Sequence, residues 1–132
     1  MNIYASFDGD SVVRFNTESS AVNTFPIPYA GDFAGSVYGV AAMYDGGVAV
    51  LQQAEEAYLI SKYSAAGNHE WSSPLLMGVV NYNLEGHRMT VSPDGRVFLA
   101  YRDGLYVVAA DGSTAEDLGI AVAPCVIPVI PA

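Results

Sequence analysis

The chain has 132 residues, of which 52% are hydrophobic and only 14% are charged. This balance excludes a disordered chain, and the length suffices for one domain with a modest core. The formal net charge is −9, from 14 acidic and 5 basic residues, and it excludes nucleic acid as a partner because phosphates would be repelled. So few charges leave part of a monomer's surface apolar, which favours burial against a partner.

The first predicted unit covers residues 1–30. Two β-rich runs, 3–7 and 11–16, flank a turn that contains glycine, which predicts a hairpin. A third run, 21–27, ends among prolines, and these exclude a central strand because proline has no N–H to donate.

The second predicted unit covers residues 36–80. Its predicted strands are 36–44, 48–53, 58–63 and 69–72, and residues 74–86 connect it to the next unit. Residues 52–57 have helix-favouring side chains, so a short helix is the alternative there. Alignment with the other units instead favours a strand at 48–53, a hairpin loop at 54–56 and a second strand at 58–63.

The third predicted unit covers residues 87–122. Its turn Ser92-Pro93-Asp94-Gly95 is the clearest signal in the chain, because proline presets the turn and Asp-Gly closes it. Its predicted strands are 88–91, 97–102, 105–110 and 115–122.

The units repeat one pattern, in which two apolar strands are joined by a tight turn. Ile3, Val48 and Val97 open the three copies, so the spacing is 45–49 residues, within the range typical of repeat architectures. The strands are apolar on both faces, which favours small sheets stacked face to face. Tyr4, Tyr58, Tyr101 and Tyr106 fall inside these strands, and we expect them to pack in the core or between neighbouring units.

Three segments carry a resemblance to a known family. Residues 91–101 and 105–113 resemble successive strands and turns of β-propeller blades, as in the NHL, YVTN and WD40-like groups. Residues 58–68 match the same element in the second unit, and 13–19 match it more loosely. The resemblance covers most of residues 1–122, without the Trp-Asp and Gly-His signatures of the WD40 group.

The resemblance implies an all-β domain at 1–123, built as a propeller-like array of about three small antiparallel blades. Complete propellers have typically four to eight blades, and the first unit here begins at its second strand. We therefore expect an array that is open within one chain and closed by oligomerisation or by docking on a partner.

Residues 124–132 form an apolar, proline-rich C-terminal segment that suits an extended arm. Its apolar side chains, together with two outlying aromatic residues, are the predicted interface residues: Val126, Ile127, Val129, Ile130, Trp71 and Tyr82. A weakly packed end is the alternative interpretation of this segment.

Motifs for chemistry are weak in this sequence. Aspartates in glycine-containing turns, such as Asp8 and Asp10, could ligate calcium, but turn chemistry explains them without a metal. His69 and His87 have no metal-ligand spacing, and no nucleophile motif occurs. Cys125 is the only cysteine, so it forms no intrachain disulfide and is interpreted as a buried small hydrophobe. We expect no enzyme activity, no metal and no cofactor.

The sequence favours a non-enzymatic structural or interaction module that acts inside a larger assembly, such as the virion of a bacteriophage. The expected partner is a second copy or another assembly protein. A lectin-like propeller that binds a glycan or small ligand is the alternative. The start of the chain lacks a signal-peptide pattern and no apolar run reaches about 18 residues, so we expect folding in a cytoplasm and no membrane span.

Overall fold

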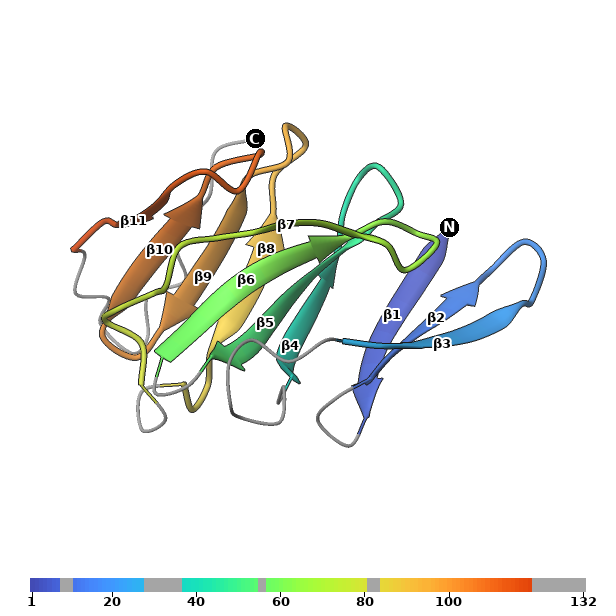
Figure 1. Ribbon diagram of the computed structural model, residues 1–132, viewed down its shortest axis with the longest axis horizontal. Helices are drawn as coiled ribbons and strands as arrows, with labels where there is room; N and C mark the ends of the chain where they lie inside the picture. The colour runs from blue at the N-terminus through green and yellow to red at the C-terminus, as the bar shows by residue number, and fades with distance from the viewer. Residues whose placement is uncertain (8–10, 28–36, 55–56, 81–83, 120–132) are drawn as a thin grey trace.

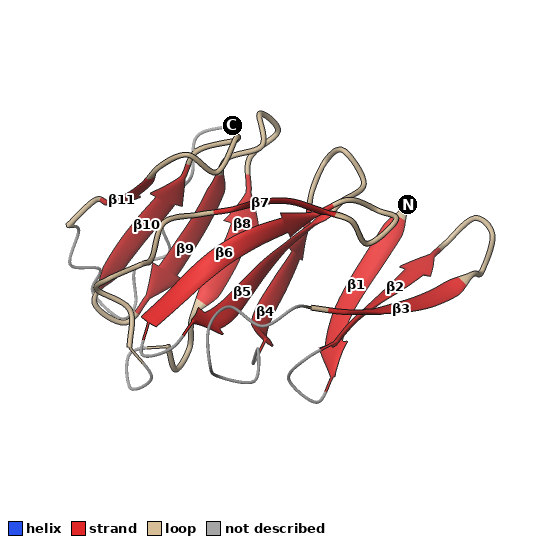
Figure 2. Cartoon of the chain, viewed as in Figure 1, coloured by secondary structure: helices blue, strands red, loops and turns tan. Residues whose placement is uncertain are grey.

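The structure is a computed structural model, and it describes residues 1–7, 11–27, 37–54, 57–80 and 84–119. All regular elements in this part of the chain are strands, as Figure 2 shows. They form three antiparallel sheets, which confirms the predicted all-β class. None of the described residues forms a helix that is long and apolar enough to cross a membrane.

The first sheet has three strands, which pair in the order β1–β2–β3. They are β1 (Asn2–Phe7), β2 (Ser11–Asn16) and β3 (Val22–Pro26). Pro26 is the last residue of the edge strand β3, where its missing N–H costs no ladder bond.

The second and third sheets have four strands each, and every strand pairs with the next one along the chain. The second sheet comprises β4 (Val37–Ala42), β5 (Val48–Ala54), β6 (Ala57–Tyr63) and β7 (His69–Ser72). The third comprises β8 (Arg88–Val91), β9 (Val97–Tyr101), β10 (Gly104–Val108) and β11 (Ala115–Asp117).

Two predicted boundaries can be compared with the structure. Gln52 and Gln53 lie in β5, so the strand interpretation is confirmed and the helical alternative is wrong there. Gln52 is buried, and packing overrides its helix propensity. The strand predicted at 115–122 is shorter than expected among the described residues, because β11 ends at Asp117.

In each of the three sheets, a backbone hydrogen bond closes the turn before the last strand. A backbone N–H at the start of the turn donates to a carbonyl at its end: Asn16 to Ala21 at 3.0 Å, Ser64 to Asn68 at 2.8 Å and Ala109 to Thr114 at 3.0 Å. By this correspondence β1, β2 and β3 match the last three strands of the other sheets. The sequence likewise predicts that the first unit begins at its second strand. No described residue supplies the first strand of that unit.

The second sheet lies between the other two, as Figure 1 shows. Successive residues of β5 point to opposite faces and enter different cores. Val48 and Val50 pack with Val12 of the first sheet, whereas Ala49 and Leu51 pack with residues of the third sheet. The described part of the chain is therefore a stack of three sheets with two apolar cores, and it does not close into a barrel or ring.

Candidate functional site

Two equivalent turns lie at one end of the second and third sheets. In both, the N–H at the first position donates to the carbonyl four residues on: Met43 to Gly47 at 2.9 Å, and Ser92 to Arg96 at 2.9 Å. Gly46 and Gly95 have the same φ of +91°. That left-handed conformation favours glycine, which explains the Asp-Gly pair in each turn.

Charged side chains fix the turn of the second sheet. Lys62 donates a hydrogen bond to Asp45 and forms an ion pair with Glu70 at 3.0 Å. The hydrogen bond from Lys62 holds the pKa of Asp45 below its usual value. Burial alone would lower the pKa of Lys62, but its hydrogen bonds to Asp45 and Glu70 outweigh burial and raise it.

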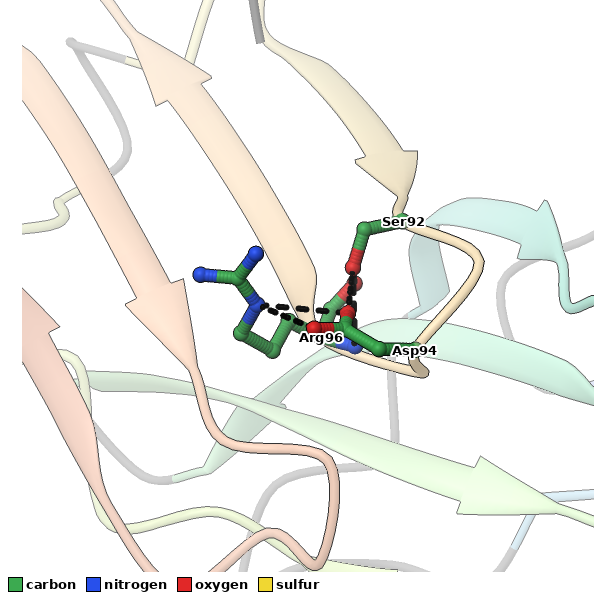
Figure 3. A network of polar contacts seen from close by, with 3 residues as sticks. All are labelled: Ser92, Asp94 and Arg96. Carbon is green, nitrogen blue, oxygen red and sulfur yellow. Dashed lines mark hydrogen bonds and ion pairs between the residues drawn. The ribbon is translucent and has the colours of Figure 1, made fainter. Parts of the chain in front are cut away.

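The turn of the third sheet has its own network, drawn in Figure 3. The Ser92 hydroxyl donates to Asp94, and Arg96 Nε lies 3.0 Å from Asp94 Oδ2. The bond from Ser92, with that from Arg96, lowers the pKa of Asp94. Both turn carboxylates are therefore ionised at neutral pH and already have donors within the chain.

A hollow of about 230 Å³ lies between these turns. Its lining residues are Met43, Tyr44, Asp45, Lys62, Pro93, Asp94, Gly95 and Ala110. Tyr44 is 72% exposed at its rim. The volume is below the usual range of about 300–1,000 Å³ for small-molecule pockets.

The aspartates serve as turn residues, as the sequence analysis favours. Oδ1 of Asp45 accepts from Gly47 N at 2.9 Å, and Oδ1 of Asp111 accepts from Ser113 N at 3.0 Å. Within the described ranges, no group of three or more His, Cys, Asp or Glu residues could hold a metal ion. Asp8 and Asp10 lie outside the described residues.

The two histidines are held separately. One His69 ring nitrogen lies 2.8 Å from the Ser72 hydroxyl, and Nδ1 of His87 lies 2.9 Å from the Leu84 carbonyl oxygen. Neither residue lines the hollow. Among the described candidates, the structure therefore brings Asp45 and Asp94 to one hollow and leaves both histidines outside it.

Neighbouring sheets are joined by an aromatic ring against a turn glycine. A Cβ on Gly67 would lie 3.0 Å from the ring of Phe25, and a Cβ on Gly112 would lie 2.5 Å from the ring of Trp71. Phe25 lies in the last strand of the first sheet and Trp71 in the last strand of the second. In the third sheet, the position equivalent to Trp71 is held by Glu116. Glu116 pairs with Val107 in the same way that Trp71 pairs with Lys62 in the second sheet.

Polar contacts also join the first sheet to the second. Tyr4 donates from its hydroxyl to the Gly46 carbonyl at 2.5 Å, and Asn2 donates to the same oxygen at 3.1 Å. Arg14 donates to the Ala65 carbonyl. One face of the first sheet is thus occupied within the chain.

The opposite face of the first sheet is apolar and exposed. Because side chains alternate along a strand, residues next to those bound to the second sheet point away from it. We call this the outer face of the first sheet, and its residues are Ile3, Ala5, Ser11, Val13, Phe15, Val22, Thr24 and Pro26. Ile3 is 51% exposed, Phe15 38% and Val22 62%. None of the eight residues is charged.

Of the predicted interface residues, Trp71 lies in the described part of the chain. Its side chain is half-buried, packs on the core between the second and third sheets and contacts Gly112. Its additional role in binding a partner stays a prediction. Tyr82, Val126, Ile127, Val129 and Ile130 lie outside the described residues.

The sequence predicts an array that is open within one chain, and the outer face is one such open end among the described residues. The sequence does not identify the residues of this face, because the strands of the first unit read as apolar on both sides, like those of the other two units.

Comparison with solved structures shows a similarity in fold. No family model and no curated protein matches the chain. A crystal structure of a protein of unknown function from Bacteroides caccae superposes with a TM-score of 0.50 and 14% sequence identity. The match covers 85% of this chain and 38% of the other, so this chain spans well under half the length of that protein. At this identity the similarity concerns the fold alone.

Proposed function

We propose that the protein is a non-enzymatic interaction module, a propeller-like array of three blades that binds an assembly partner through the outer face of its first sheet. The exposed row of Ile3, Phe15 and Val22 carries this proposal. Among the described residues, Tyr38 of β4 is the one large apolar side chain in the other two sheets that is exposed to a comparable degree, at 39%, and it stands singly rather than in a row. Contiguous exposed apolar surface of this kind marks protein interaction sites.

The repeat supports the same proposal. Each sheet of the stack buries a face of its neighbour, and no sheet among the described residues covers the outer side of the first one. A partner there would extend the stack in the way that the chain itself is built. The matched part of the Bacteroides caccae structure is a minority of a longer chain, so a similar fold occurs there with further protein attached. A virion is one assembly in which such a module would act, with the segment 124–132 as a second contact.

The proposal is tested by photo-crosslinking in the cells from which the protein comes. A benzophenone amino acid replaces Phe15 in one full-length chain and the exposed Tyr44 in a matched control. We expect a protein crosslink from position 15 and none from position 44. Absence of a crosslink at position 15, or equal crosslinks at both, would contradict the proposal.

A second candidate function is carbohydrate binding at the hollow between the turns. It is favoured by the exposed ring of Tyr44 beside the carboxylates of Asp45 and Asp94, because aromatic faces and hydrogen-bonding groups together suit a sugar ring. A glycan array with the wild-type chain and Tyr44→Ala tests it. Saturable binding that Tyr44→Ala abolishes would support it, and an array without signal would exclude it for the sugars displayed.

A further inference from the structure

The two ends of the stack differ in what they offer a partner. At the first sheet, the outer face exposes its large apolar residues. At the third sheet, Phe98 and Leu105 lie on the side away from the second sheet and are each only 7% exposed, so they are already buried within the chain. Arg88 and Glu116 are exposed on that same side. A head-to-tail contact between copies would therefore place an apolar face against one whose apolar residues are not available.

We infer that the partner of the outer face is a second copy of this chain, bound through the same face in a two-fold symmetric dimer. This inference rests on the proposed function and names its partner. A two-fold contact uses one self-complementary patch, so it needs nothing from the other end of the stack.

The side chains of the outer face form two rows that differ in size. Ile3, Phe15 and Val22 lie opposite one another across the three strands, and Ala5, Val13 and Thr24 form the next row. A two-fold axis that runs across the strands between these rows places the large row of each copy over the small row of the other. Phe15 then packs on Val13 of the second copy, and Val13 on its Phe15, which suits close packing between sheets about 10 Å apart.

Charge favours the same face. Each copy carries a net charge of −9, so most contacts between copies would bring carboxylates together. The outer face is uncharged. Arg14 lies in β2 between Val13 and Phe15, but its side chain is bound to Ala65 on the opposite side of the sheet. Contact through the outer face therefore buries apolar surface without burying a charge.

The size of the face sets the expected affinity. Three strands about 4.8 Å apart and about five residues long give a flat area of roughly 14 Å by 17 Å. This is well below the ~800 Å² per partner of a standard stable interface. We expect a reversible dimer with a dissociation constant on the order of 100 μM.

Sedimentation equilibrium of the full chain over a concentration series tests the inference. Phe15→Lys and Val13→Glu each place two unpaired charges in the contact, one from each copy, and each should weaken dimerisation at least about tenfold. A mixture of the two variants pairs Lys with Glu across the axis and leaves the native Phe15–Val13 contact on the other side. We expect the mixture to form a heterodimer with affinity restored to within a few-fold of the wild type. Met77→Lys, at a residue 73% exposed elsewhere, should leave dimerisation unchanged.

Three results would overturn the inference. They are a wild-type chain that stays monomeric up to about 1 mM, a Phe15→Lys chain that dimerises like the wild type, and a mixture of folded variants that fails to associate. Circular dichroism spectra that match the wild type show that the variants are folded. If the chain is monomeric while position 15 still crosslinks to a different protein in cells, the proposed function stands and the dimer does not.

Discussion

The buried tyrosines differ in how their hydroxyl groups are bound. The Tyr106 hydroxyl accepts from Gly78 N at 3.0 Å, and the Tyr101 hydroxyl donates to Asp117 at 3.3 Å. The Tyr58 hydroxyl is buried and finds no hydrogen-bond partner in the part of the chain that the structure describes. Close packing of an aromatic ring therefore does not guarantee a hydrogen bond for its hydroxyl group.

Replacing Tyr58 by phenylalanine should therefore be harmless or favourable. Tyr58→Phe removes an unpaired buried hydroxyl, and we expect the free energy of unfolding to stay equal or rise by up to about 1 kcal/mol. Tyr106→Phe is the matched control, which loses a real hydrogen bond and should cost about 1 kcal/mol. Urea unfolding of both variants gives the comparison, and a loss at Tyr58 as large as that at Tyr106 would contradict it.

Stability at high pH should depend on Tyr101. Burial, with the nearby Asp117 carboxylate, raises its pKa from 10.0 to about 12. The unfolded chain loses this proton first, so the stabilisation is present below pH 10 and is lost between pH 10 and about 12. We expect Tyr101→Phe to flatten that part of the profile of unfolding free energy against pH. Parallel profiles for the two chains would refute this assignment.

At the scale of elements, most strands follow directly from sequence patterns. Apolar runs and Asp-Gly turns predict the hairpins because Gly46 and Gly95 need positive φ. The sequence could not predict the contact between Trp71 and Gly112, since 41 residues separate them and their meeting depends on how two sheets stack.

The contact between Trp71 and Gly112 gives a prediction for the junction of the second and third sheets. Gly112→Ala adds a Cβ 2.5 Å from the ring at a φ of +74°, whereas Gly86→Ala adds one at +76° with no atom within 4 Å. Both variants pay the same backbone strain of about 1 kcal/mol. Gly112→Ala should cost about 1–3 kcal/mol more because it also forces the sheets apart. Thermal unfolding measures the difference, and equal losses would mean that the ring yields freely.

At the scale of the whole molecule, few charges and a high net charge act in opposite directions. The low share of charged residues leaves an apolar end, and the net charge of −9 opposes association between copies. In the proposed dimer, the apolar contribution of the outer face has to exceed this repulsion. Association should therefore depend on the ionic strength.

The proposed dimer should strengthen with added salt. Raising NaCl from about 20 mM to about 300 mM screens the repulsion between the two acidic copies, and we expect the dissociation constant to fall several-fold. Sedimentation at both concentrations measures it, with Phe15→Lys as the control that stays monomeric. A dimer that weakens with salt would indicate an interface held by ion pairs.

The sequence by itself determined the all-β class, the repeated turns and most strand boundaries, because hydrophobic runs and turn residues act over short distances. It also identified Tyr58, Tyr101 and Tyr106 as core residues, which the structure confirms. Only the tertiary structure decided which apolar faces are covered. Phe15 and Tyr58 both lie in apolar strands, but one is 38% exposed and the other 1%. The physical reason is that burial of a sheet face depends on the neighbour stacked against it, and within the described ranges the first sheet has such a neighbour on one side only.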